Sequence, residues 1–200
     1  MPLLEPLNPE DLPEYAHVFE AVERSMGFVP ASLRTLARMP VLMEAFGNLM
    51  RTVENLGEID PGLHQMIANI ASVAGGCRYC QAHTANHAAH LGVSEEKLEA
   101  LWSFEVSDLF SEAERVALRF ALAAASVPNL VTEKHHAEMH EHYTEGQIIE
   151  ILATVSVFGW LNRWNDSMGT ILEDDPASFA EKHLGDQGWE IGKHGKRDAE

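Results

Sequence analysis

The sequence predicts an all-α protein, a helical bundle built from a duplicated helical unit. Apolar residues recur at three- and four-residue spacing through most of the 200 residues, which is the pattern of amphipathic helices. Helix-start signals precede these stretches, namely Asp60-Pro61, Ser111-x-x-Glu114 and Thr144-x-x-Gln147. The last of them repeats Ser94-x-x-Lys97 at an offset of about 50 residues, which indicates two copies of one unit.

In the first half, most of the expected helices carry a start or stop signal of their own. Pro40 and Pro61 suit the first turn of a helix, where the N–H that proline lacks has no partner in any case. Gly75-Gly76 breaks the helix that Pro61 opens, and Gly92 is the expected C-cap of the next one. We therefore expect helices over about 13–26, 30–39, 40–56, 61–74, 77–91 and 94–103.

The second half is expected to be a degenerate copy of the first. Ser111-x-x-Glu114 opens a helix, and Pro128-Asn129 interrupts the chain much as Gly75-Gly76 does. Helices follow over about 132–142 and 145–171. The second of these is apolar nearly all round, so we expect it at the centre of the bundle or in a subunit interface. The copy contains no cysteine, which places the chemistry in the first half.

The length suits a single domain, which we expect over residues 1–184. Within it, the cysteine-bearing unit covers about 27–103 and the degenerate copy about 110–173. Residues 185–200 are polar and interrupted by glycines. We expect this tail to be disordered or draped on a partner subunit of a homo-oligomer.

The chain is strongly acidic, with 31 Asp and Glu against 14 Lys and Arg and a formal net charge of −17. This charge argues against nucleic acid or an anionic membrane as a partner. The N-terminus lacks the basic region and apolar run of a signal peptide, and no apolar stretch reaches the ~20 residues that span a bilayer. We expect a soluble, cytoplasmic protein.

The only two cysteines form a Cys-x-x-Cys pair, Cys77 and Cys80, at the expected start of a helix. There they face unpaired backbone N–H groups and the positive end of the helix dipole, which favour thiolate over thiol. One helical turn separates them, so they are close enough to form a disulfide after one sulfur is oxidised. The pattern is typical of a redox-active pair.

Histidine follows the pair, because His83 is three residues beyond Cys80 and His87 lies one turn further. An imidazole beside Cys80 can take the thiol proton and hold the thiolate as an ion pair. No acidic residue occurs between Pro61 and Ser94, so no local carboxylate raises the thiol pKa. Any carboxylate that orients His83 must therefore come from another part of the fold.

Other interpretations of these residues stay open. The cysteines can be small core residues, although the spacing and the following histidine argue against this. A zinc site that uses both Cys77 and His87 is unfavourable, because roughly 15 Å of helix axis separates them. A site formed by Cys80, His83 and another segment is less strongly excluded. The pair His136 and His140 also tempts a metal assignment, but acidic, histidine-rich helix surfaces are usually solvated.

The run Gly-Cys-Arg-Tyr-Cys-Gln-Ala-His-Thr at 76–84, followed by Leu-Gly-Val-Ser-Glu-Glu-Lys-Leu at 91–98, resembles a known family. The family that it resembles is the alkyl hydroperoxidase D-like branch of the carboxymuconolactone decarboxylase superfamily, and the resemblance covers about 27–173. It implies an all-helical oligomer that reduces hydroperoxides with its cysteine pair. By resemblance, Cys80 attacks the peroxide and Cys77 resolves the intermediate, although the dipole alone favours Cys77 as the more acidic thiol.

The chain departs from the family pattern at two positions. Family members carry a histidine four residues after the second cysteine, where this chain has Thr84, and His83 stands one residue early. They also carry a glutamate twelve residues before the first cysteine, where this chain has Gln65. An amide cannot transfer a proton as a carboxylate does, so the proton relay must differ.

We therefore expect a thiol-dependent hydroperoxide reductase with Cys80, Cys77, His83 and His87 at its catalytic site. No cofactor and no metal are assigned to it. An external dithiol, which the resemblance allows to be lipoyl-linked, restores the reduced pair. The competing hypothesis is a disulfide carrier or redox adaptor of the same fold, and Gln65 and the shifted histidine favour it.

Overall fold

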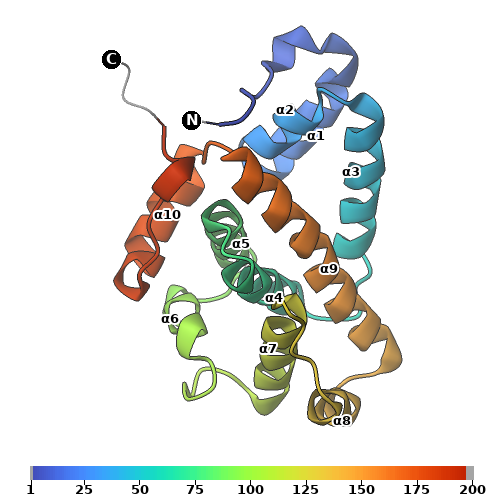
Figure 1. The fold of residues 1–200 in the computed structure, drawn as a ribbon, viewed down its shortest axis with the longest axis vertical. Coiled ribbons are helices and arrows are strands. Elements are labelled where there is room, and N and C mark those ends of the chain that lie inside the picture. The colour runs from blue at the N-terminus through green and yellow to red at the C-terminus, as the bar shows by residue number, and fades with distance from the viewer. Residues whose placement is uncertain (1, 197–200) are drawn as a thin grey trace.

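The computed structural model describes residues 2–196, which form ten α-helices and no strand (Figure 1). The α-helices are α1 (Ala16–Met26), α2 (Ala31–Leu36), α3 (Pro40–Glu54), α4 (Pro61–Ala74), α5 (Arg78–His90), α6 (Glu95–Glu99), α7 (Glu112–Ala125), α8 (Glu133–His142), α9 (Glu145–Met168) and α10 (Asp174–Leu184). Short 3-10 turns occupy Pro9–Asp11, Pro13–Tyr15, Ala100–Ser103, Gly185–Gln187 and Gly192–His194. The all-α prediction is confirmed.

Helix α4 is the centre of the bundle and packs against α5, α7 and α9. Asp60 caps it, accepting hydrogen bonds from the N–H groups of Gly62 at 2.8 Å and Leu63 at 3.1 Å. Every residue from Gly62 to Ser72 is buried, because other helices cover α4 on several sides. The polar residues of α4 are therefore enclosed in the core, among them His64, Gln65 and Asn69.

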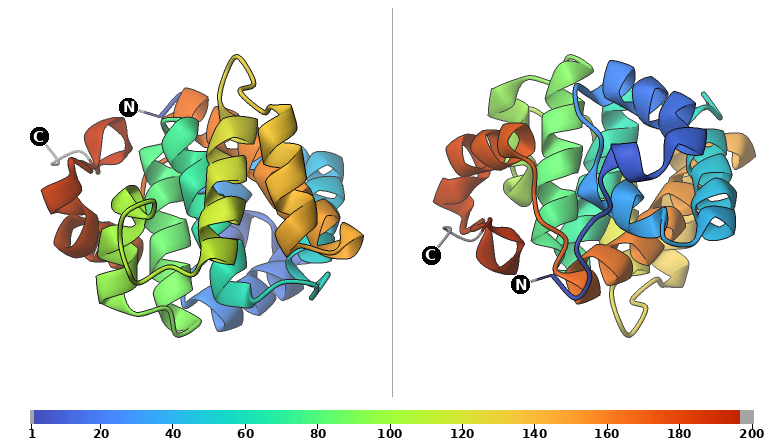
Figure 2. Two further views of the ribbon diagram at one scale, coloured as in Figure 1. Left: turned by 90° about the horizontal axis from the view of Figure 1, so that it is seen from below. Right: turned by 90° about the horizontal axis from the view of Figure 1, so that it is seen from above.

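Helix α9 crosses the molecule beside α4 and α5, as Figures 1 and 2 show. The expected capping box is present at its start, where Thr144 and Gln147 bond each other's backbone N–H groups. It ends at Met168, three residues earlier than predicted, because Gly169 takes left-handed backbone angles (φ 60°, ψ 42°). Its apolar surface is only partly covered in one chain, since Ile149 is 63% exposed.

The C-terminal region corrects the prediction of a disordered tail beginning at Gly185. Helix α10 lies beside α5 and α6, and the chain then continues in contact with α5 through the turn Gly192–His194. Trp189 and His194 are buried there, at 4% and 0% exposure. Composition favoured disorder because polar residues and glycines dominate this stretch, whereas two buried rings anchor it. The expectation for 197–200 lies outside the described residues.

Among residues 2–196, no helix has both the length and the apolar character needed to cross a membrane. The proposed duplication stays a prediction. Helices α4 and α7 both have 14 residues, but α5 and α8 have 13 and 10, and α6 and α9 have 5 and 24.

Candidate active site

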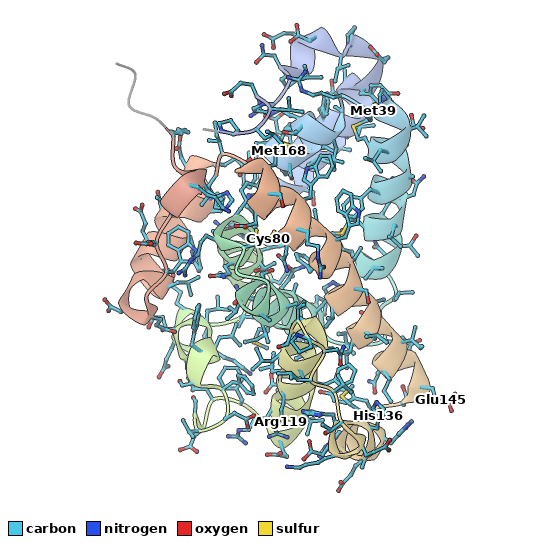
Figure 3. All side chains as sticks on the ribbon, viewed as in Figure 1. Met39, Cys80, Arg119, His136, Glu145 and Met168 are labelled. Atoms are coloured by element: carbon cyan, nitrogen blue, oxygen red, sulfur yellow. The ribbon has the colours of Figure 1, made fainter. Side chains whose placement is uncertain are left out.

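The turn between α4 and α5 sets the geometry of the cysteine pair. Gly76 takes a positive φ of 69°, which lets the chain reverse direction between the helices. Cys77 becomes the N-cap of α5, and its Sγ accepts a hydrogen bond from the N–H of Cys80 at 3.4 Å. Both are free thiols, and they are 0% and 2% exposed. Cys80 lies near the middle of the molecule, whereas Arg119 and His136 lie near its lower end (Figure 3).

The surroundings of the two sulfurs differ, and they disfavour a resting thiolate at Cys80. Burial raises the pKa of Cys80 well above its ordinary value, and the adjacent Cys77 sulfur raises it further. The Cys77 sulfur stands at the N-terminus of α5 and accepts a backbone N–H there. Negative charge on the pair is therefore better placed on Cys77. The expectation that His83 brings the pKa of Cys80 down is wrong for this arrangement.

His83 is instead paired with a carboxylate from the other end of the chain. Its Nε2 lies 2.6 Å from Oε2 of Glu173, the residue that precedes α10. The second oxygen, Oε1, accepts hydrogen bonds from the N–H of Ala31 at 2.6 Å and the hydroxyl of Tyr79 at 3.2 Å. Burial acts to raise the pKa of Glu173, but the bonds to His83 and Ala31 outweigh it, so the pKa falls below its usual value.

Two aromatic rings hold the His83 imidazole in place. The Tyr79 ring stacks on it with centroids 4.3 Å apart, and Phe28 meets it edge-on at 5.4 Å. A surface pocket of about 430 Å³ borders this imidazole and runs along α5 past His87. Burial lowers the pKa of His87, which favours its neutral form. His87 therefore lies in this pocket, and neither cysteine lines it.

No local feature of the sequence points to Glu173, which is 90 residues from His83. In the polar stretch 162–166 near the end of α9, Asp166 pairs with Lys193 at 2.7 Å. Arg163 donates to the carbonyl of Gly159 at 2.9 Å. The same stretch reaches the cysteines, because Asn165 Nδ2 donates to Cys80 Sγ at 3.4 Å.

No group of three metal-binding side chains is assembled within residues 2–196, in the cysteine region or at the histidines of α8. This region offers the two cysteine sulfurs as nucleophiles. The Asn165 amide and the His83–Glu173 pair are the polar groups near them. A paired sulfur nucleophile with nearby proton-carrying groups can transfer two electrons by forming a disulfide.

The region around the cysteines is similar to a known protein family. The model of the carboxymuconolactone decarboxylase family matches residues 40–123, a range that contains both cysteines, His83 and His87. The protein YnjA of Escherichia coli is 26% identical over 147 residues, which are 72% of this chain and 80% of YnjA.

Solved structures of similar shape extend the match to nearly the whole chain. The debrominase Bmp8, in a cysteine-to-alanine variant with 2,3,4-tribromopyrrole, is 35% identical; the match covers 90% of this chain and 96% of Bmp8 with a TM-score of 0.85. A peroxidase-related protein with an alkylhydroperoxidase AhpD core, from Ralstonia eutropha, has a TM-score of 0.76 at 23% identity. That match covers 88% of this chain and 94% of the other, and at this identity it supports the fold alone.

Proposed function

Because the chain belongs to the carboxymuconolactone decarboxylase superfamily, and its cysteine motif resembles the alkyl hydroperoxidase D-like branch, we propose that it is a two-cysteine reductase of hydroperoxides. One observation carries this proposal: Cys77 and Cys80 share the first turn of α5, joined by the bond from the Cys80 N–H to the Cys77 sulfur. A cycling pair suits a reducing compartment, so we place the protein in the cytoplasm.

In the proposed cycle, the pair supplies two electrons and one proton. Cys80 passes its proton to the Cys77 thiolate and attacks one peroxide oxygen, which breaks the O–O bond. Cys80 becomes a sulfenic acid, and the alkoxide that leaves takes a proton from His83 or water. Cys77 then attacks the Cys80 sulfur, the S–O bond breaks, and the departing hydroxide takes the Cys77 proton to form water. The products are an alcohol, water and the Cys77–Cys80 disulfide.

The His83–Glu173 pair serves the leaving group rather than the thiol in this scheme. An imidazole held by a carboxylate in one orientation is well suited to deliver a proton at a fixed point. His83 lines the pocket and is three residues from Cys80 on α5. An external dithiol then reduces the disulfide by thiol–disulfide exchange.

A second candidate is reductive dehalogenation of a halogenated aromatic ring, favoured by the 35% identity to a debrominase over nearly its whole length. The same pair would supply the electrons: the C–Br bond breaks, carbon gains a proton, and bromide and the disulfide form. The buried sulfurs favour a compact peroxide, because neither cysteine lines the pocket beside His83. The redox adaptor remains the non-enzymatic alternative.

One experiment separates these three functions. The reduced protein is given dithiothreitol with either ethyl hydroperoxide, a compact peroxide, or 2,3,4-tribromopyrrole, and peroxide loss and bromide release are followed. Peroxide loss above the dithiol background, abolished in both Cys77→Ser and Cys80→Ser, supports the proposal. Bromide release without peroxide loss supports the dehalogenase. A disulfide that forms and is reduced without either turnover supports the adaptor.

The two serine variants also test the roles of the sulfurs. If Cys80 attacks and Cys77 resolves, a sulfenic acid on Cys80 should form more slowly in Cys77→Ser, because the thiolate that takes the Cys80 proton is missing. Once formed it should persist and be detected as a dimedone adduct. An adduct on Cys77 in Cys80→Ser, with none in the converse variant, would reverse the assignment.

A further inference from the structure

We propose that Asn165 is a catalytic residue of the thiol site, whose amide stabilises negative charge on the Cys80 sulfur, and that Thr170 and His194 hold it in position. This inference rests on the proposed function, since it assigns the group that supports the attacking sulfur. It also makes the C-terminal segment a part of the active site.

The Asn165 amide contacts the Cys80 sulfur directly. Asn165 lies near the end of α9 and is 1% exposed, and its Nδ2 donates to Cys80 Sγ at 3.4 Å. An N–H directed at sulfur favours the anion over the thiol. Burial, the Cys77 sulfur and the Asp166 carboxylate all raise the pKa of Cys80, whereas the bond from Asn165 lowers it. Asn165 thus opposes the surroundings that keep Cys80 protonated.

A second feature is the orientation of the amide. Gly169 takes left-handed backbone angles after α9, and the N–H of Thr170 returns to the Asn165 carbonyl at 3.1 Å. This reversal places the Thr170 hydroxyl against the Asn165 side chain, where it donates to Oδ1 at 3.0 Å. Since the oxygen of the amide is engaged by Thr170, its NH₂ group is turned toward the sulfur.

His194, in the C-terminal segment, contacts this turn. The His194 ring is fully buried and donates from Nδ1 to the carbonyl of Thr170 at 2.7 Å. The backbone carbonyl of His194 accepts the N–H of Leu172 at 2.8 Å, so one residue fixes both ends of the 170–172 turn. Trp189 adds a bond from its Nε1 to the carbonyl of Arg78, in the first turn of α5, at 3.2 Å.

A matched residue on the same helix makes the proposal testable. Asn162 is one turn earlier on α9 and is also buried, at 3% exposure. Its Nδ2 donates to the carbonyl of Ala71 at 3.1 Å instead of to a sulfur. Removing the Asn162 amide takes one buried hydrogen bond from α9 and removing the Asn165 amide takes two, but only removal of the Asn165 amide changes the surroundings of Cys80.

The experiment titrates the Cys80 thiol in the full chain without any substrate. The Cys77→Ser background leaves Cys80 as the sole thiol, and its thiolate is read from the absorbance near 240 nm against pH. We expect Asn165→Ala to lower the thiolate fraction at a given pH by about tenfold, the effect of one lost bond to a charged group. Asn162→Ala should leave the titration unchanged. Equal titrations for both alanine variants and the parent would overturn the proposal.

The positioning role of Thr170 is tested with two substitutions, one of which keeps the hydroxyl group. Thr170→Val keeps the shape of the side chain but removes the hydroxyl, so the thiolate fraction should fall as in Asn165→Ala. Thr170→Ser keeps the hydroxyl and should restore the parent titration. A Thr170→Val variant that titrates like the parent refutes this part, and so does a Thr170→Ser variant that titrates like Thr170→Val. Because no substrate enters these measurements, a shifted titration without turnover rejects the proposed function and leaves Asn165 in its role.

Discussion

Glu173→Gln is expected to destabilise the protein by about 2 kcal/mol at neutral pH. The carboxylate is mostly buried, with 15% of its side chain exposed, and it bonds His83 at 2.6 Å and the Ala31 N–H at 2.6 Å. Glutamine keeps an oxygen for Ala31 but loses the charge that His83 meets. The loss of one charge-assisted bond is worth about 1.5–3 kcal/mol. For a chain of this size, the melting temperature should fall by roughly 4–8 °C.

Urea unfolding at pH 7 measures this change, with Asp174→Asn as the control. Asp174 is the next residue, and its side chain is 83% exposed while it pairs with Lys196. Removing its charge should change the free energy of unfolding by less than about 0.5 kcal/mol. A Glu173→Gln variant as stable as Asp174→Asn would show that the buried carboxylate does not hold His83 and α5 together.

The same variant carries a pH signature. The pKa of Glu173 is lower in the folded chain than its usual value, so the unfolded chain binds its proton first as the pH falls. The stabilisation by this carboxylate is complete above a pH of about 4.3 and is lost as the pH falls through the folded pKa. The stability gap between the parent and Glu173→Gln should therefore be constant from pH 7 to 5 and close below that range. A gap that widens in acid would contradict the assignment.

Further predictions concern the packing and the backbone around the site. Trp189→Ala should lower the free energy of unfolding in urea by about 3–5 kcal/mol, because Trp189 packs in the cluster that contains both cysteines. It should also speed alkylation of the cysteines in the native state. An unchanged alkylation rate would mean that Trp189 does not cover the cysteines. Gly169→Ala should destabilise the protein by about 1 kcal/mol, because Gly169 has a φ of 60°. Gly47→Ala in α3, where open space surrounds the added methyl group, should be neutral or stabilising. Equal effects would contradict the role of the positive φ at Gly169. The pKa of His87 is lowered in the folded chain, so the unfolded chain binds the proton first and stability is lost as the pH falls below about 6.5. His87→Gln should therefore make the free energy of unfolding change less steeply with pH between pH 7 and 5. An unaltered pH dependence would exclude His87 as its source.

Features that depend on local geometry could be predicted from the amino-acid sequence. Asp60-Pro61 and Thr144-x-x-Gln147 cap helices where expected, because a cap involves only residues within one turn. The place of Cys77 and Cys80 on the first turn of α5 follows in the same way from Gly75-Gly76 and the Cys-x-x-Cys spacing. Fold class and the position of the cysteine pair were thus predictable.

Tertiary structure decided which groups surround that pair. Glu173 meets His83 from 90 residues away, and Asn165 meets Cys80 from 85 residues away, so no spacing in the sequence points to either contact. The C-terminal segment shows the same limit, since its polar composition favoured disorder while two rings, Trp189 and His194, hold it in the core. The physical reason is that burial and long-range hydrogen bonds set the energy of these side chains, and both exist only once distant helices have packed together.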